Sequence, residues 1–298
     1  TAADLDADHV TDYIYGGDML GNVWRFDLSS KTVTDWAAGA YPVFKADQPI
    51  TTAIVVSSTT KNDIYRVILN FGTGRLFPKT LDKIPGSAPG DHYIYGIWDS
   101  DMDAWNAKSA FTYQSLTLSG SAKTVGSGEL LTRTITDSTF VNEALGINGA
   151  RTISNESLCW KGSTTCTVAN KRGWRTKLPK TNEQIFYNPV FQDGFVMFNT
   201  TVPEVAELLS CDIQAAAGFT MALSPETGAA QKSYFKNTGW TGDVLAGIGT
   251  SGVGSVITVR SGSRTFGVTQ TTTGKEKTFE LDSGANANYK RITWIKRR

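Results

Sequence analysis

The sequence has little charge, no long apolar run and few of the side chains that bind zinc. Charged residues make up 19% of the 298-residue chain, and 29 basic residues almost balance 28 acidic ones. The net charge of +1 lacks the basic excess typical of nucleic-acid-binding domains, so we expect no nucleic-acid partner. The stretch closest to a membrane span, residues 245–259, contains four glycines and falls short of ~20 apolar residues, so we expect no membrane-spanning helix.

The chain also lacks an initial methionine and an apolar leader. It begins Thr1-Ala2-Ala3 and enters an aspartate-rich motif at Asp4. Natural proteins rarely open on such a motif, so we interpret the sequence as a fragment or a processed form with more chain upstream. Its length is sufficient for a substantial core without metals or disulfides.

Three cysteines and two histidines are too few for a typical zinc site. Cys159 and Cys166 lie seven residues apart, and Gly162 between them permits a turn. We predict a disulfide between these two cysteines, which implies an oxidising compartment; the alternative is two buried thiols. Cys211 is then either free and buried or paired with a cysteine outside this fragment.

Short apolar and β-branched runs, separated by Gly, Pro, Asn, Asp and Ser, recur along the chain and predict strands almost throughout. The clearest predicted strands are Asp12–Tyr15, Val23–Leu28, Ala53–Ser57, Tyr65–Phe71, Tyr93–Asp99, Ile185–Tyr187, Gly194–Thr200, Gly218–Leu223, Ser255–Val259 and Arg291–Trp294. This pattern indicates an all-β sandwich, barrel or propeller. Recurrent Gly and aromatic positions favour the propeller, and residues 218–228 resemble a quinoprotein blade, with Ser224 in place of its aspartate.

The clearest chemical signal is the acidic loop at residues 4–12. Carboxylates occupy its positions 1, 3, 5 and 9, which is the spacing of an EF-hand-type calcium loop. The predicted ligands of one Ca²⁺ are Asp4, Asp6, Asp8, Asp12 and the backbone carbonyl of Val10.

The loop departs from the EF-hand pattern at two positions. His9 replaces the glycine at position 6, and Tyr15 replaces the glutamate at position 12. A strand is predicted to follow in place of a helix, so the site would be a nine-residue loop on a β-fold. The alternative is a solvated acidic turn. A second acidic run, Asp99 to Asp103, lacks the fourth carboxylate, and we interpret it as an acidic loop after a strand.

Motifs of catalysis are weak or missing. The letters GxGxxG occur at residues 247–252, but the sequence after them predicts a strand, whereas a dinucleotide site needs a helix there. The chain has no P-loop, HExxH or GxSxG motif. We therefore predict a protein that is not an enzyme.

An ordered set of motifs resembles the PilC/PilY family of type IV pilus tip proteins. The central one is residues 12–28, DYIYGGDMLGNVWRFDL, directly after the acidic loop. Further motifs in the family's order are Gln48–Thr51, Phe71–Arg75, Tyr95–Asp99, Gly173–Trp174, Thr200–Pro203 and Lys290–Trp294. The resemblance covers nearly the whole chain and implies a C-terminal, modified (quinoprotein-like) β-propeller domain over residues 1–298. The chain is short enough to hold only the C-terminal blades of such a domain.

The resemblance also implies a function. Members of this family are secreted proteins at the pilus tip or outer membrane of Gram-negative bacteria, where they prime pilus assembly with minor pilins and adhere to host cells or abiotic surfaces. It implies that calcium in the loop is linked to pilus extension and retraction, and that the protein supports twitching motility and virulence. The alternatives are a quinoprotein-like propeller dehydrogenase and a structural propeller in which calcium only stabilises the fold.

Overall fold

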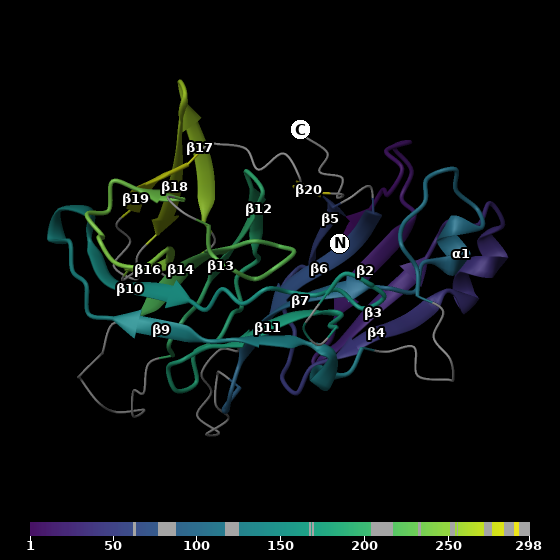
Figure 1. The fold of residues 1–298 in the computed structure, drawn as a ribbon, viewed down its shortest axis with the longest axis horizontal. Coiled ribbons are helices and arrows are strands. Elements are labelled where there is room, and N and C mark those ends of the chain that lie inside the picture. Colours follow the sequence, from purple (N-terminus) through teal and green to yellow (C-terminus); the bar gives the residue numbers. More distant parts are fainter. Residues whose placement is uncertain are drawn as a thin grey trace.

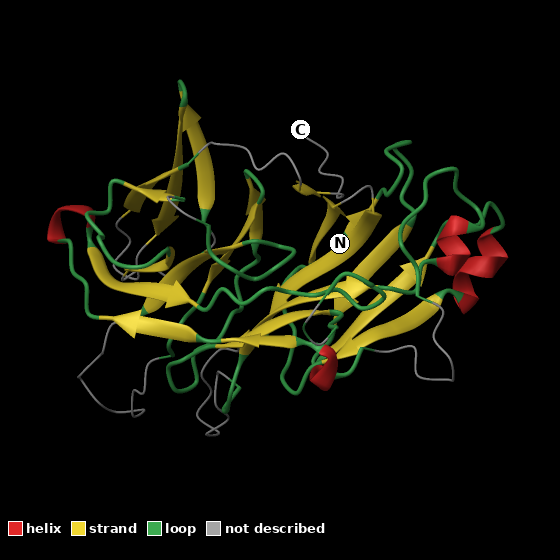
Figure 2. Cartoon of the chain, in the orientation of Figure 1, coloured by secondary structure: helices red, strands yellow, loops and turns green. Residues whose placement is uncertain are grey.

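The computed structural model describes residues 1–61, 64–76, 88–116, 125–166, 168, 170–203, 217–231, 234–250, 254, 256–270, 276–282 and 289–291. Strands hold 48% of the residues and helices 6%, so the fold is all-β as predicted. Figure 2 shows that the helices are short and lie at the periphery of the strands. Within the ranges above, no helix has the length and apolarity needed to cross a membrane.

The strands between residues 2 and 99 form two sheets, and the second of these also takes three strands from later in the chain (Figure 1). Sheet one has, in spatial order, β1 (Ala2–Ala3), β2 (Tyr13–Gly17), β3 (Asn22–Asp27) and β4 (Ala40–Lys45). Sheet two has, in spatial order, β20 (Tyr289–Arg291), β5 (Val55–Lys61), β6 (Ile64–Gly72), β7 (Tyr93–Asp99), β11 (Gly173–Lys177) and β8 (Leu131–Arg133). Of the strand pairs in these two sheets, β8 and β11 run parallel and the others antiparallel.

Two further sheets are built from strands between residues 135 and 281. Sheet three has, in spatial order, β12 (Val190–Gln192), β13 (Phe195–Asn199), β14 (Gly218–Leu223), β16 (Leu245–Thr250), β10 (Ile147–Ile153) and β9 (Ile135–Ser138). Sheet four has, in spatial order, β15 (Phe235–Lys236), β19 (Glu276–Leu281), β18 (Arg264–Gln270) and β17 (Ile257–Ser261). The short helices are α1 (Asp103–Asn106) and the 3₁₀ turns η1 (Val33–Ala38), η2 (Ser127–Glu129) and η3 (Glu143–Leu145).

The four sheets pack in chain order through three apolar cores. Between sheets one and two, the Phe44 ring lies 5.0 Å from that of Tyr95. The other face of sheet two packs on sheet three around Trp174 and Phe198. Sheet three in turn packs on sheet four around Phe279. Sheets two and three are thus buried on both faces, an arrangement expected of successive propeller blades.

Most predicted strands form, and their ends move by a few residues. Tyr93–Asp99 and Gly218–Leu223 are confirmed at both ends as β7 and β14. The prediction for Ile185–Tyr187 is wrong: Ile185 is buried, but its N–H donates to the carbonyl of Thr73, directly after β6, and no strand forms. The last predicted strand is seen as β20 up to Arg291, and residues 292–294 lie outside the described residues.

The predicted disulfide between Cys159 and Cys166 is present. Cys159 is buried beside Trp160, whose indole N–H donates to Glu226 at 3.0 Å. The disulfide therefore closes a short loop next to sheet two, where Trp160 packs on Trp98 of β7. Cys211 lies outside the described residues.

A buried ion pair joins sheet one to sheet two. Arg25 of β3 donates to both carboxylate oxygens of Asp99, the last residue of β7, at 2.8 and 2.9 Å. Tyr15 of β2 donates its hydroxyl to the same carboxylate at 2.7 Å. Burial holds the pKa of Tyr15 well above its usual value, so this hydroxyl remains a donor. The rings of Tyr13 and Tyr41 lie 5.2 and 4.8 Å from the guanidinium.

The substitution Asp99→Asn is expected to destabilise the fold by about 3–5 kcal/mol, because it removes the carboxylate 2.8 Å from the buried Arg25 and leaves only the more distant Asp101 carboxylate, at 3.9 Å. The measurement is the free energy of unfolding from urea titration. The control is Asp91→Asn, which breaks an exposed pair with Lys177 and should leave the unfolding midpoint nearly unchanged. Equal effects of the two variants would contradict the importance given to the buried pair.

Candidate metal site

The acidic loop joins β1 to β2, and the pairing of these strands brings its two ends together. Ala3 lies opposite Tyr13, and the Asp12 N–H donates to the Ala3 carbonyl at 2.9 Å. Asp4 and Asp12 are buried, with 8% and 7% of their surface exposed, whereas residues 6–10 face solvent. The loop therefore projects from the edge of sheet one and has two buried carboxylates at its base.

Three of the predicted ligands converge. Carboxylate oxygens of Asp4, Asp6 and Asp8 lie within 4.8 Å of one another. Ala7, between Asp6 and Asp8, and His9, directly after Asp8, have φ angles of 63° and 71°. This left-handed backbone conformation makes the loop turn tightly at both positions. His9 therefore adopts the type of conformation for which an EF-hand loop uses glycine, so its presence does not prevent the turn.

Backbone N–H groups hold the three carboxylates in place. The His9 N–H donates to Asp4 Oδ2 at 3.0 Å, and the Val10 N–H donates to Asp8 Oδ1 at 2.7 Å. The Asp8 N–H donates to Asp6 Oδ1 at 3.3 Å. Because these bonds form within the loop itself, the spacing of the aspartates is enough to set their arrangement.

One carboxylate oxygen in the loop is left without a partner. Asp4 Oδ1 is buried and accepts no hydrogen bond within the described part of the chain. A buried acceptor without a donor is costly, and a cation would satisfy it. Calcium prefers hard oxygen ligands at about 2.3–2.6 Å, so the residues present fit this ion.

The remaining two predicted ligands are placed differently. Asp12 lies outside the group of three, and its Oδ2 accepts the Leu5 N–H at 2.6 Å. Burial and, to a smaller extent, the neighbouring carboxylates raise the pKa of Asp12, the hydrogen bond from Leu5 lowers it, and the net result is a pKa of about 7. Val10 is exposed, and its carbonyl remains a predicted ligand.

The second acidic run does not form a comparable cluster. Within the described ranges, the loop at residues 4–12 provides the one group of three metal-binding side chains close enough to share an ion. Asp99 is 1% exposed and binds Arg25, and Asp103 begins α1. Only residues 100–102 form a loop, because Asp99 ends β7 and Asp103 begins α1, so the interpretation of the whole run as a loop holds only for its middle.

Comparisons with known proteins agree with the resemblance found in the sequence. Residues 1–129 match the family model described as the PilY1 beta-propeller domain. The chain is 26% identical over 261 residues to the type IV pilus biogenesis factor PilY1 of Pseudomonas aeruginosa strain UCBPP-PA14, with 76% of this chain and 21% of that protein covered. It is 25% identical over 300 residues to a PilY1 homolog of Xylella fastidiosa, with 96% and 21% covered.

A solved structure supports the same fold. The crystal structure of the Pseudomonas aeruginosa PilY1 C-terminal domain matches with a TM-score of 0.60 and 19% identity, covering 95% of this chain and 60% of that chain. The resemblance to the pilus proteins and the all-β propeller class are confirmed. This chain spans about a fifth of the length of the two curated relatives named above, 21% in each case.

Proposed function

We propose that this chain is the calcium-binding propeller part of a type IV pilus biogenesis factor. One Ca²⁺ would be held by the carboxylates of Asp4, Asp6, Asp8 and Asp12 and by the carbonyl of Val10. The similarity to pilus biogenesis factors over most of the chain supports the pilus role. The observation that carries the calcium site is the convergence of three carboxylates around the buried, unpartnered Asp4 Oδ1.

The charge of the loop explains what the ion would contribute. Four carboxylates within nine residues repel one another, and a divalent cation offsets this repulsion. Asp12 directly precedes Tyr13, the first residue of β2, so an ion bound by Asp12 would fix the start of that strand. The ion would therefore act as a switch or a staple of the fold, with no chemical reaction at the site.

The proposed location is outside the cell, at the pilus tip or the outer-membrane surface of a Gram-negative bacterium. The proposed partners are minor pilins and a host-cell or abiotic surface, and the proposed roles are pilus assembly and retraction, twitching motility and adhesion. The names of the relatives support a pilus-associated, non-enzymatic role, because they describe biogenesis factors. The disulfide supports an oxidising compartment.

Calcium binding is tested by calorimetric titration of the purified chain. We expect one site, and we expect the double substitution of Asp6→Asn and Asp8→Asn to weaken binding by at least roughly tenfold, because it removes two charged oxygen ligands. At about 100 times the dissociation constant, calcium should stabilise the native chain by about 2.7 kcal/mol. Asp103→Asn is the matched control, since it removes one exposed carboxylate of the second run. Unchanged affinity in the double variant would exclude this site.

The pilus role is tested in the natural host with the full-length protein. We expect deletion of the gene to abolish surface pili, and the Asp103→Asn form to restore them. The Asp8→Asn form, made and exported at the same level, should restore assembly, twitching or adhesion incompletely. Full restoration by Asp8→Asn would mean that the ion only stabilises the fold and has no regulatory role. Normal piliation after deletion of the gene would contradict the pilus role itself.

A further inference from the structure

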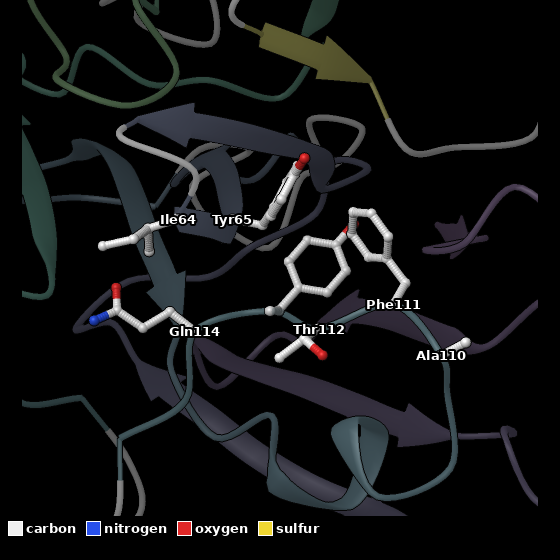
Figure 3. Close-up of a pocket in the computed structure, with 7 residues that line it drawn as sticks. Ile64, Tyr65, Ala110, Phe111, Thr112 and Gln114 are labelled. Atoms are coloured by element: carbon white, nitrogen blue, oxygen red, sulfur yellow. The ribbon is translucent and has the colours of Figure 1, made fainter.

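An aromatic cleft lies beside the acidic loop. Tyr65 of β6 and the segment 110–114 line an open cleft of about 460 Å³, with Ile64 and Gln114 at one side (Figure 3). The rings of Tyr65 and Phe111 are 4.7 Å apart, and those of Phe111 and Tyr113 are 5.1 Å apart. Two of the three aromatic walls therefore belong to a single short segment after α1, and the position of that segment determines the shape of the cleft.

Tyr113 is attached to the base of the acidic loop. Its hydroxyl donates to the Leu5 carbonyl at 3.0 Å in a buried contact, and the Leu5 N–H donates to Asp12 at 2.6 Å. From the other side, Asn106 of α1 holds the Tyr113 backbone: its Nδ2 donates to the Tyr113 carbonyl at 2.6 Å, and its Oδ1 accepts the Tyr113 N–H at 3.0 Å. Tyr113 is thus held between Asn106 of α1 and Leu5, and Leu5 lies between the predicted calcium ligands Asp4 and Asp6.

Phe111 is attached to the tip of the loop through Ser109. The Ser109 hydroxyl accepts the Phe111 N–H at 3.1 Å and donates to Asp6 Oδ2 at 3.5 Å. Asp6 is one of the three converging carboxylates, so any inward movement of its side chain toward a cation changes the contact that holds Ser109. The loop and the cleft therefore share two independent connections, one buried and one exposed.

We propose that the acidic loop and the aromatic cleft form one coupled unit, in which a cation bound by the loop fixes the Phe111 and Tyr113 walls of the cleft. This inference rests on the proposed calcium site, and it states that calcium binding there changes the conformational freedom of residues 109–114. A ligand shifts a conformational equilibrium only through its different affinity for the two states. The coupling must then be reciprocal, so cutting either connection lowers the affinity of the loop for calcium.

Hydrogen–deuterium exchange of the whole chain, with and without calcium, tests the coupling. We expect saturating calcium to slow exchange in residues 109–114. Tyr113→Phe removes the buried connection and should abolish the slowing and weaken calcium binding by about three- to tenfold, the worth of one hydrogen bond. Ser109→Ala should have a smaller effect in the same direction. Tyr65→Phe is the matched control, because it removes a hydroxyl from the cleft wall on β6 and should alter neither exchange nor affinity.

Calorimetry on the same samples separates the two possible failures. If the chain binds no calcium, the proposed site is wrong and the coupling falls with it. If the chain binds calcium but exchange in residues 109–114 is unchanged, the site stands and the coupling is overturned. Calcium affinity in Tyr113→Phe and Ser109→Ala equal to that of Tyr65→Phe would also overturn it.

Discussion

The buried pair of Arg25 and Asp99 is the interaction on which both the acidic loop and the aromatic cleft depend. Arg25 belongs to sheet one and Asp99 ends a strand of sheet two, so the pair joins the two sheets. Tyr13, which flanks the guanidinium, directly follows Asp12. The three residues after Asp99 lead into α1, whose Asn106 holds the segment 109–114 through Tyr113. We therefore expect this desolvated ion pair to support both the loop and the cleft wall, which contact each other through Tyr113 and Ser109.

Local pattern in the sequence was enough to predict the class of fold and most of its strands. Tyr93–Asp99 has side chains buried on both faces of the sheet, and its apolar and aromatic residues are typical of such a strand. The error at Ile185–Tyr187 shows the limit of this reasoning. Ile185 is buried like a strand residue, but its backbone N–H bonds to Thr73, which lies over a hundred positions earlier in the chain. Which neighbour a short apolar segment finds depends on tertiary packing, and a single sequence does not specify it.

The candidate site was predictable where its contacts are local and unpredictable where they are distant. The convergence of Asp4, Asp6 and Asp8 follows from their spacing, because backbone N–H groups of the same loop orient them. Ser109 and Tyr113 lie about a hundred residues away, and no motif marks them. The role of Asp99 was hidden for the same reason, since the second acidic run gives no sign of its partner Arg25.

The account is tested most directly by the position of the ion. Crystals of the chain grown with saturating calcium should show an anomalous peak in the loop, about 2.3–2.6 Å from oxygens of Asp4, Asp6 and Asp8. Asp12 and the Val10 carbonyl are expected to complete the coordination, with the pair of Arg25 and Asp99 intact below. A well-ordered loop with no anomalous peak at saturating calcium, or an anomalous peak only at another position on the chain, would contradict the account.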